Sequence, residues 1–140
     1  MEKKRKVLLK LSGEALAGQS HTGFDLSVVQ NVAGQVKEAV DEGVRVDVVI
    51  GGGNFWRGRT GEEIDRTKSD QIGMLATVMN AIYVSEVFRG AGMATRIFTP
   101  FVCGAMTELF SKDRATESWE RGEASSPSAA SVCFNRSRLA

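Results

Sequence analysis

The chain has 140 residues, of which 42% are apolar and 25% charged, as expected for a single globular domain. Eighteen basic residues against seventeen acidic ones leave a formal charge of +1, which argues against an electrostatic nucleic-acid binder. No apolar run approaches the roughly 20 residues of a membrane span, and the N-terminus lacks a signal-peptide core. The two cysteines form neither a disulfide framework nor a metal cluster. We therefore expect a soluble, cytoplasmic protein with no nucleic-acid or membrane partner.

Predicted strands and helices alternate along the chain. Short, β-prone apolar runs predict parallel-type strands at 6–11, 44–50 and 95–99. Helical spacing, with Asp25 as an N-cap, predicts helices at 26–43, at about 69–89 and at about 111–121. In the longest helix, Met74 and Met79 are expected in the core, and a set of apolar residues faces broadly one way: Ile72, Leu75, Met79, Ile82 and Val87. This alternation predicts an α/β fold with a parallel sheet and right-handed crossovers.

Glycine is the residue whose distribution points to a binding site. Fifteen residues are glycine, and six of them fall between Gly51 and Gly73, which indicates a backbone that approaches something closely. Two glycine turns, at 10–13 and 51–58, directly follow the first two predicted strands. In an open α/β sheet, ligands bind outside the carboxyl ends of the strands, so both turns point to the same edge.

The two turns hold the parts that a phosphoryl-transfer site requires. Glycine N–H groups can converge on an anion with no Cβ in the way, and Lys10 and Arg57 would supply positive charge. Phosphoryl transfer needs mainly positioning and charge neutralisation from the protein. Taken singly, Lys10 can also be the polar end of a strand, Arg57 a solvated loop arginine and Asp70 a residue that complements a helix dipole. The P-loop and dinucleotide-binding motifs are absent.

Three segments together resemble bacterial uridylate (UMP) kinase, a family of the amino-acid-kinase superfamily. They are KVLLKLSGEAL at 6–16, VVIGGGNFWRG at 48–58 and DQIGMLATVMN at 70–80. The resemblance runs from Lys4 to about Glu123; the two turns would fit any amino-acid kinase, whereas the run from Gly73 to Asn80 selects the UMP enzyme. It implies a three-layer α/β/α sandwich with a mostly parallel sheet, incomplete at the C-terminus.

The resemblance also implies roles for single residues. An ATP-phosphate turn comprises Lys10, Leu11, Ser12 and Gly13, with Lys10 as the catalytic residue that stabilises charge on the transferring phosphoryl group. Gly53 and Arg57 match ATP-binding positions, and Gly52 and Asp70 match positions that bind the phosphate and the ribose of UMP. The family uses Mg²⁺ with ATP, works as a homohexamer, and is commonly activated by GTP and inhibited by UTP. No residue of this chain is assigned as a metal ligand.

The chain departs from the family after about residue 123. Family members continue with an apolar strand and a Gly-Thr-Gly segment that holds UMP, and a second half then supplies the adenine site and a catalytic aspartate. Here residues 124–140 include five serines and no acidic residue, and the strand that the alternation demands is missing. We expect 1–123 to be the N-terminal part of an amino-acid-kinase domain and 124–140 a non-homologous tail, either disordered or frameshifted.

A frameshift near codon 123 is a testable hypothesis for the tail. Serine codons of the TCN type, read one base back, encode apolar residues, and alanine codons read in the same way can encode glycine. Residues 125–130 would then resemble the missing strand and its glycine turn. Genomic DNA whose neighbouring frame holds no kinase continuation would exclude this hypothesis.

From the sequence we therefore predict the N-terminal segment of a UMP kinase, which transfers a phosphoryl group from ATP to UMP in pyrimidine nucleotide biosynthesis. These 140 residues are expected to show little or no catalysis, because half of the family's site is absent. Two alternatives stay open. One is another amino-acid kinase, acting on a carboxylate or a carbamate, and the other is an inert fragment that only associates through the helix at 69–89.

Overall fold

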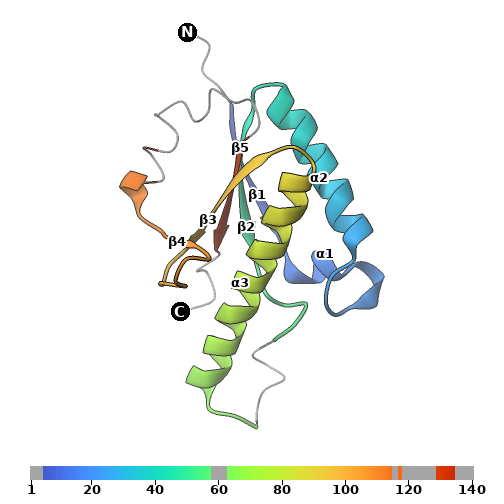
Figure 1. Ribbon diagram of the computed structural model, residues 1–140. Coiled ribbons are helices and arrows are strands. Elements are labelled where there is room, and N and C mark those ends of the chain that lie inside the picture. Colours follow the sequence, from blue (N-terminus) through green and yellow to red (C-terminus); the bar gives the residue numbers. More distant parts are fainter. Residues whose placement is uncertain (1–4, 58–62, 115–116, 118–128, 135–140) are drawn as a thin grey trace.

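The computed structural model describes residues 5–57, 63–114, 117 and 129–134 and forms a five-stranded sheet (Figure 1). The strands are β1 (Lys6–Leu11), β2 (Arg45–Ile50), β3 (Ala94–Thr99), β4 (Glu108–Leu109) and β5 (Ala129–Phe134). Their order in the sheet is β1-β2-β5-β3-β4, and every neighbouring pair is parallel. The predicted α/β class with a parallel sheet is confirmed.

The helices begin and end at capping residues. They are α1 (Gly13–Ala17), the 3₁₀ turn η1 (Gly18–Ser20), α2 (Leu26–Asp41) and α3 (Arg66–Gly90). Asp25 caps α2 as predicted, because its Oδ1 accepts hydrogen bonds from the N–H groups of Ser27 and Val28. The Ser27 hydroxyl also donates to Asp25, and this bond holds the pKa of the Asp25 carboxyl below its usual range. Of the predicted last helix, residues 112–114 and 117 are helical, Ser111 precedes the first helical residue, and residues 115–116 and 118–121 lie outside the described residues.

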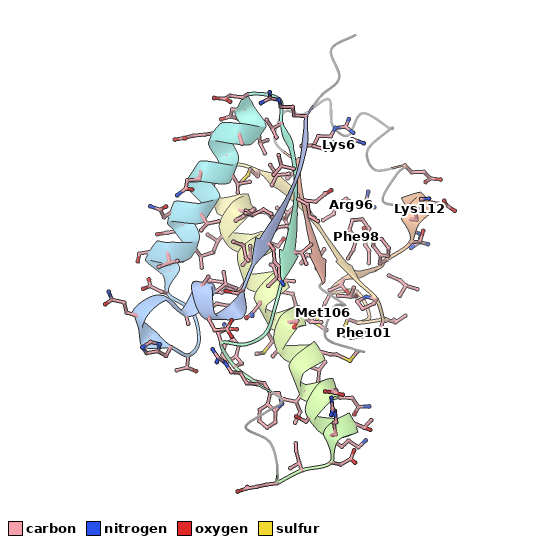
Figure 2. The ribbon with its side chains drawn as sticks, turned by 180° about the vertical axis from the view of Figure 1, so that it is seen from behind. Lys6, Arg96, Phe98, Phe101, Met106 and Lys112 are labelled. Atoms are coloured by element: carbon pink, nitrogen blue, oxygen red, sulfur yellow. The ribbon has the colours of Figure 1, made fainter. Side chains whose placement is uncertain are left out.

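Helices α2 and α3 lie on one face of the sheet and enclose the core with β1 and β2 (Figure 1). The residues buried there are aliphatic or aromatic side chains from all four elements: Leu11, Val29, Val36, Val40, Val46, Val48, Ile50, Val84 and Phe88. On the opposite face, Arg96 and Phe98 point away from these helices, and Arg96 forms a two-bond ion pair with Glu108 (Figure 2). Within the described residues, the long helices thus cover a single face of the sheet.

Helix α3 buries one face against the core and leaves large apolar residues exposed on the other. Ala81, Val84 and Phe88 are fully buried, whereas Leu75 is 59% and Met79 47% exposed. The expectation that Met79 lies in the core was therefore wrong. Met79 lies on the exposed face of the helix, whereas its chain neighbours Val78 and Asn80 lie on the other side and are buried. By length and composition alone the helix could span a membrane, and 44% of its most apolar window is buried inside the structure.

Strand β5 corrects the prediction that no strand follows Gly122. It lies between β2 and β3, with Val132 in register with Val48 on one side and Ile97 on the other. A gap between two parallel strands leaves rows of unpaired backbone N–H and C=O groups, which an extended segment satisfies. Backbone pairing at the centre of the sheet therefore outweighs the serine-rich composition around Ala129–Phe134. The origin of the tail stays a prediction.

Candidate functional site

The two glycine turns meet at the carboxyl edge of the sheet. The N–H of Gly51 donates to the carbonyl of Leu11 at 3.1 Å. A Cβ atom placed on Gly13 would lie 2.4 Å from the backbone nitrogen of Gly53. No side chain fits in that space, so the glycine at position 13 lets the backbones of the two turns touch. The structure thus brings together the segments that the sequence predicted to share one edge.

The second turn also lies directly against helix α3. A Cβ on Gly52 would approach the Thr77 hydroxyl oxygen to 2.8 Å and the carbonyl oxygen of Gly73 to 3.0 Å. Gly73, Thr77 and Asn80 are spaced four and three residues apart, so they share one face of the helix. The run from Gly73 to Asn80 is therefore the surface of α3 on which the turn rests.

A buried pair of amide side chains joins the turn to α3. The two amides of Asn54 and Asn80 donate to each other, at 2.6 and 3.1 Å, and both residues are at most 2% exposed. Asn80 also donates to the carbonyl of Gly51 at 2.7 Å, and Asn54 to that of Gly23 at 2.8 Å. Sequence reasoning did not single out either asparagine. The available signal was an amide on the same helix face as Gly73 and Thr77.

Arg57 folds back over the second turn. Its Nη2 lies 2.8 Å from Oε1 of Glu14, and its Nε–H donates to the carbonyl of Gly53 at 3.4 Å. A Cβ on Gly53 would lie 2.4 Å from the same Glu14 oxygen, so the carboxylate covers this glycine. Glu14, which sequence reasoning also missed, thus links the first turn to the arginine of the second. Trp56 anchors the following loop, because its indole N–H donates to the buried Ser69 hydroxyl at 2.9 Å.

The backbone of the second turn has free donors. The N–H groups of Gly52 and Gly53 donate to no acceptor in the part of the chain that the structure describes. A partly buried N–H without a protein partner needs water or a ligand, and adjacent free N–H groups favour an anion. The edge where the turns meet can therefore hold a phosphate group.

The remaining predicted site residues lie around this edge. Leu11 is buried, and the Ser12 hydroxyl caps α1 by accepting from the N–H of Ala15 at 3.2 Å. Lys10 is exposed at the end of β1 and forms no ion pair with any described residue. Asp70 is exposed on α3, three residues before Gly73, and lies on the helix face that meets the turn. The structure thus brings the two turns and Arg57 into contact. Lys10 and Asp70 lie at the rim of this edge, with exposed side chains.

The charged side chains around this edge determine which ligands it can bind. Lys10 and Arg57 offer cationic donors to phosphate oxygens, and Arg57 can form paired bonds with one phosphate. Among the residues that the structure describes, no three His, Cys, Asp or Glu side chains gather as a metal site. The arrangement suits binding and alignment of phosphate groups.

Known proteins share this fold. Residues 5–124 match the model of the amino acid kinase family. A solved UMP kinase from Bacillus anthracis is 32% identical, with a TM-score of 0.82 over 99% of this chain and 55% of its own. A solved UMP kinase from Ureaplasma parvum, 23% identical with a TM-score of 0.79, shows the shared fold over 94% of this chain and 56% of its own.

The chain spans slightly more than half the length of these two kinases. The comparisons confirm the resemblance read from the sequence. Because the family model covers most of the sequence, the chain belongs to the amino acid kinase family.

Proposed function

We propose that the chain is the N-terminal, UMP-side part of a kinase that transfers the γ-phosphoryl group of ATP to UMP, giving UDP. The observation that carries the proposal is the contact of the two glycine turns, where Gly52 and Gly53 present free N–H groups. The likeness to UMP kinases supports UMP as the acceptor. Pyrimidine nucleotide biosynthesis in the cytoplasm is the corresponding role.

Each residue at the edge has a role in this proposal. Gly53 and Arg57 bind ATP phosphates, Gly52 binds the UMP phosphate, and Asp70 accepts a hydrogen bond from the ribose. Lys10 stabilises the charge that develops on the transferring phosphoryl group. In the ligand-free protein Arg57 pairs with Glu14, so an ATP phosphate competes with this carboxylate for the guanidinium.

Mg²⁺ belongs to the proposal as the ion that accompanies ATP. Protein sites for Mg²⁺ commonly use one or two carboxylates plus substrate phosphates and waters, and do not need a full protein cage. The free N–H groups and the two cations fit the phosphates of such a complex. The ion would supply further neutralisation of phosphate charge, while the chain's own residues bind and align the nucleotides.

Calorimetric titration of the 140-residue chain with UMP tests the acceptor. We expect saturable binding that weakens at least fivefold in Asp70→Asn, because a neutral amide is a poorer acceptor than a carboxylate. Glu86→Gln is the matched control, since Glu86 is an exposed acid on the same helix. Binding of acetylglutamate, aspartate or carbamate without UMP binding would favour another amino-acid kinase, and no binding at all would favour the inert fragment.

Phosphoryl transfer tests the role of Lys10 in the protein extended to the full length of its family. Lys10→Ala is expected to lower kcat far more than UMP affinity, because the ammonium acts mainly on the transferring group. Equal losses in both quantities would mean that Lys10 only binds.

We also propose that the protein forms a homo-oligomer through the outer face of α3. Ile72, Leu75, Met79 and Ile82 are between 36% and 59% exposed there. Their spacing of three and four residues forms an apolar seam, and a second copy of the same helix can cover it across a two-fold axis. The hexamer, activation by GTP and inhibition by UTP that the resemblance implies belong to this proposal.

Sedimentation equilibrium tests self-association. Leu75→Glu, on the seam, is expected to shift the protein toward monomer, whereas Glu38→Gln, an exposed acid on α2, leaves the oligomer unchanged. A monomeric wild-type chain at all concentrations would contradict the proposal. Adding GTP or UTP to the same samples tests whether either nucleotide alters the assembly.

A further inference from the structure

Asn80 holds the second turn on both sides of its free donors. One of its amide hydrogens goes to the carbonyl of Gly51, where the turn leaves β2, and the other to the side chain of Asn54, directly after Gly53. The residues between these two points, Gly52 and Gly53, carry the free N–H groups. A single side chain of α3 thus sets the position of the backbone on each side of the donors.

The hydrogen bonds of the amide pair are complete. Asn80 uses both hydrogens on Gly51 and Asn54, and Asn54 uses both on Asn80 and the carbonyl of Gly23. Both residues are buried, so removing one amide leaves buried donors and acceptors of the other without partners. The N–H of Gly23 also donates to the backbone carbonyl of Asn54, which fixes Asn54 from a third direction.

From the side of α3, a further described hydrogen bond to the second turn joins the Trp56 indole to Ser69, beyond the free donors, and it does not reach Gly52 or Gly53. Gly52 touches Gly73 and Thr77 only by close approach, and the Thr77 hydroxyl donates to Gly73 within the helix and not to the turn. Van der Waals contact limits how near the turn can come to α3, but it does not set the direction of the N–H groups. The two bonds from Asn80 do set that direction.

We propose that Asn80 is a positioning residue that acts through Asn54 to aim the Gly52 and Gly53 N–H groups at a bound phosphate. The inference rests on the proposed function only for the identity of the ligand, UMP. The ordering of the turn by Asn80 does not depend on that function. A turn released from Asn80 keeps its sequence and its fold but loses the alignment of its donors, so phosphate affinity falls more than stability does.

Amide hydrogen exchange of the 140-residue chain tests, without any ligand, whether Asn80 orders the turn. The N–H groups of Phe55 and Trp56, which donate to the carbonyl of Gly52, report on the turn. We expect Asn80→Ala to speed their exchange at least tenfold relative to wild type. Ser85→Ala is the matched control, because Ser85 is also a buried polar residue of α3, bonded to Thr95 at 2.6 Å and remote from the turn. Equal protection of Phe55 and Trp56 in both variants would overturn the inference.

Titration with UMP then separates positioning from stability. We expect the Kd for UMP to rise at least tenfold in Asn80→Ala and less than twofold in Ser85→Ala. A loosened turn with an unchanged Kd would overturn the positioning role. A wild-type chain that binds no UMP would refute the proposed function instead. The exchange data would then still show whether Asn80 orders the turn.

A second variant covers the case in which Asn80→Ala does not fold. Asn54→Ala breaks the same amide pair from the turn and leaves α3 intact, so it is expected to give the same faster exchange and weaker UMP binding. Where both variants fold, the loss of UMP affinity in the double variant should not exceed the larger single loss, because the two amides act as one unit. Losses of UMP affinity that add up in the double variant would contradict the proposal that Asn80 acts through Asn54.

Discussion

The two faces of helix α3 differ in a way that its sequence pattern conceals. The inner face carries glycine, threonine and asparagine where the turn rests, followed by Ala81, Val84 and Phe88 in the core. The outer face carries larger apolar residues, yet Leu75 and Met79 are exposed. Exposed apolar residues therefore mark the surface that we propose for a second copy, while glycine, threonine and asparagine mark the part of the inner face that builds the site.

The largest difference between the two faces is expected in stability. Phe88→Ala should lower the free energy of unfolding by about 3–5 kcal/mol, because it empties a fully buried site. Leu75→Ala, the same kind of truncation on the outer face, should change it by no more than about 0.5 kcal/mol in the monomer. Urea denaturation of both variants at low protein concentration measures the contrast. Equal losses would mean that the outer face is buried in the monomer.

The contact between turn and helix is expected to give the next largest effect. Gly52→Ala should cost about 1–3 kcal/mol, because its Cβ would crowd the backbone of Gly73 and Thr77. Gly34→Ala is the matched control: Gly34 lies within α2 with no atom near its Cβ position, so the change should stabilise by about 0.5–1 kcal/mol. Denaturation curves of the two variants should thus move in opposite directions.

Gly53, the next residue of the turn, is expected to tolerate a side chain better than Gly52. The three atoms nearest to its Cβ position all belong to the end of the flexible Glu14 side chain, so Gly53→Ala should displace this carboxylate at a smaller cost than Gly52→Ala. The displaced Glu14 is expected to release Arg57 from its ion pair. A cost equal to that of Gly52→Ala would show that the turn is held rigidly on both sides.

The smallest effect is expected at the start of α2, away from both faces of α3. The folded-state pKa of Asp25 is lowered, chiefly by the Ser27 hydroxyl, so its contribution to stability is present above the ordinary value of 3.8. That contribution is lost as the pH falls through the lower, folded-state pKa. Asp25→Asn removes the titration, and the stability advantage of wild type over this variant should shrink in acid. Denaturation at neutral and acidic pH, with an advantage that did not change, would contradict this.

Local patterns predicted most of the elements but not the pairing of the last strand. The first strand, Lys6–Leu11, matches its prediction, and the Asp25 cap is confirmed, because short apolar runs and capping oxygens act over a few residues. Strand β5 was not predicted, since its place depends on the gap between β2 and β3. The site divides in the same way: glycine turns are visible in sequence, whereas Glu14, Asn54 and Asn80 acquire their partners only across the fold.

The sequence by itself determined the α/β alternation, the two glycine turns at the carboxyl ends of β1 and β2, and the family. Each of these depends on residues that are neighbours in the chain. Only the tertiary structure decided which face of α3 is buried, which amide holds the second turn, and which segment completes the sheet. Those outcomes depend on contacts between residues far apart in sequence, such as Asn80 with Gly51 and Val132 with Val48, where close approach and buried hydrogen bonds override local preference.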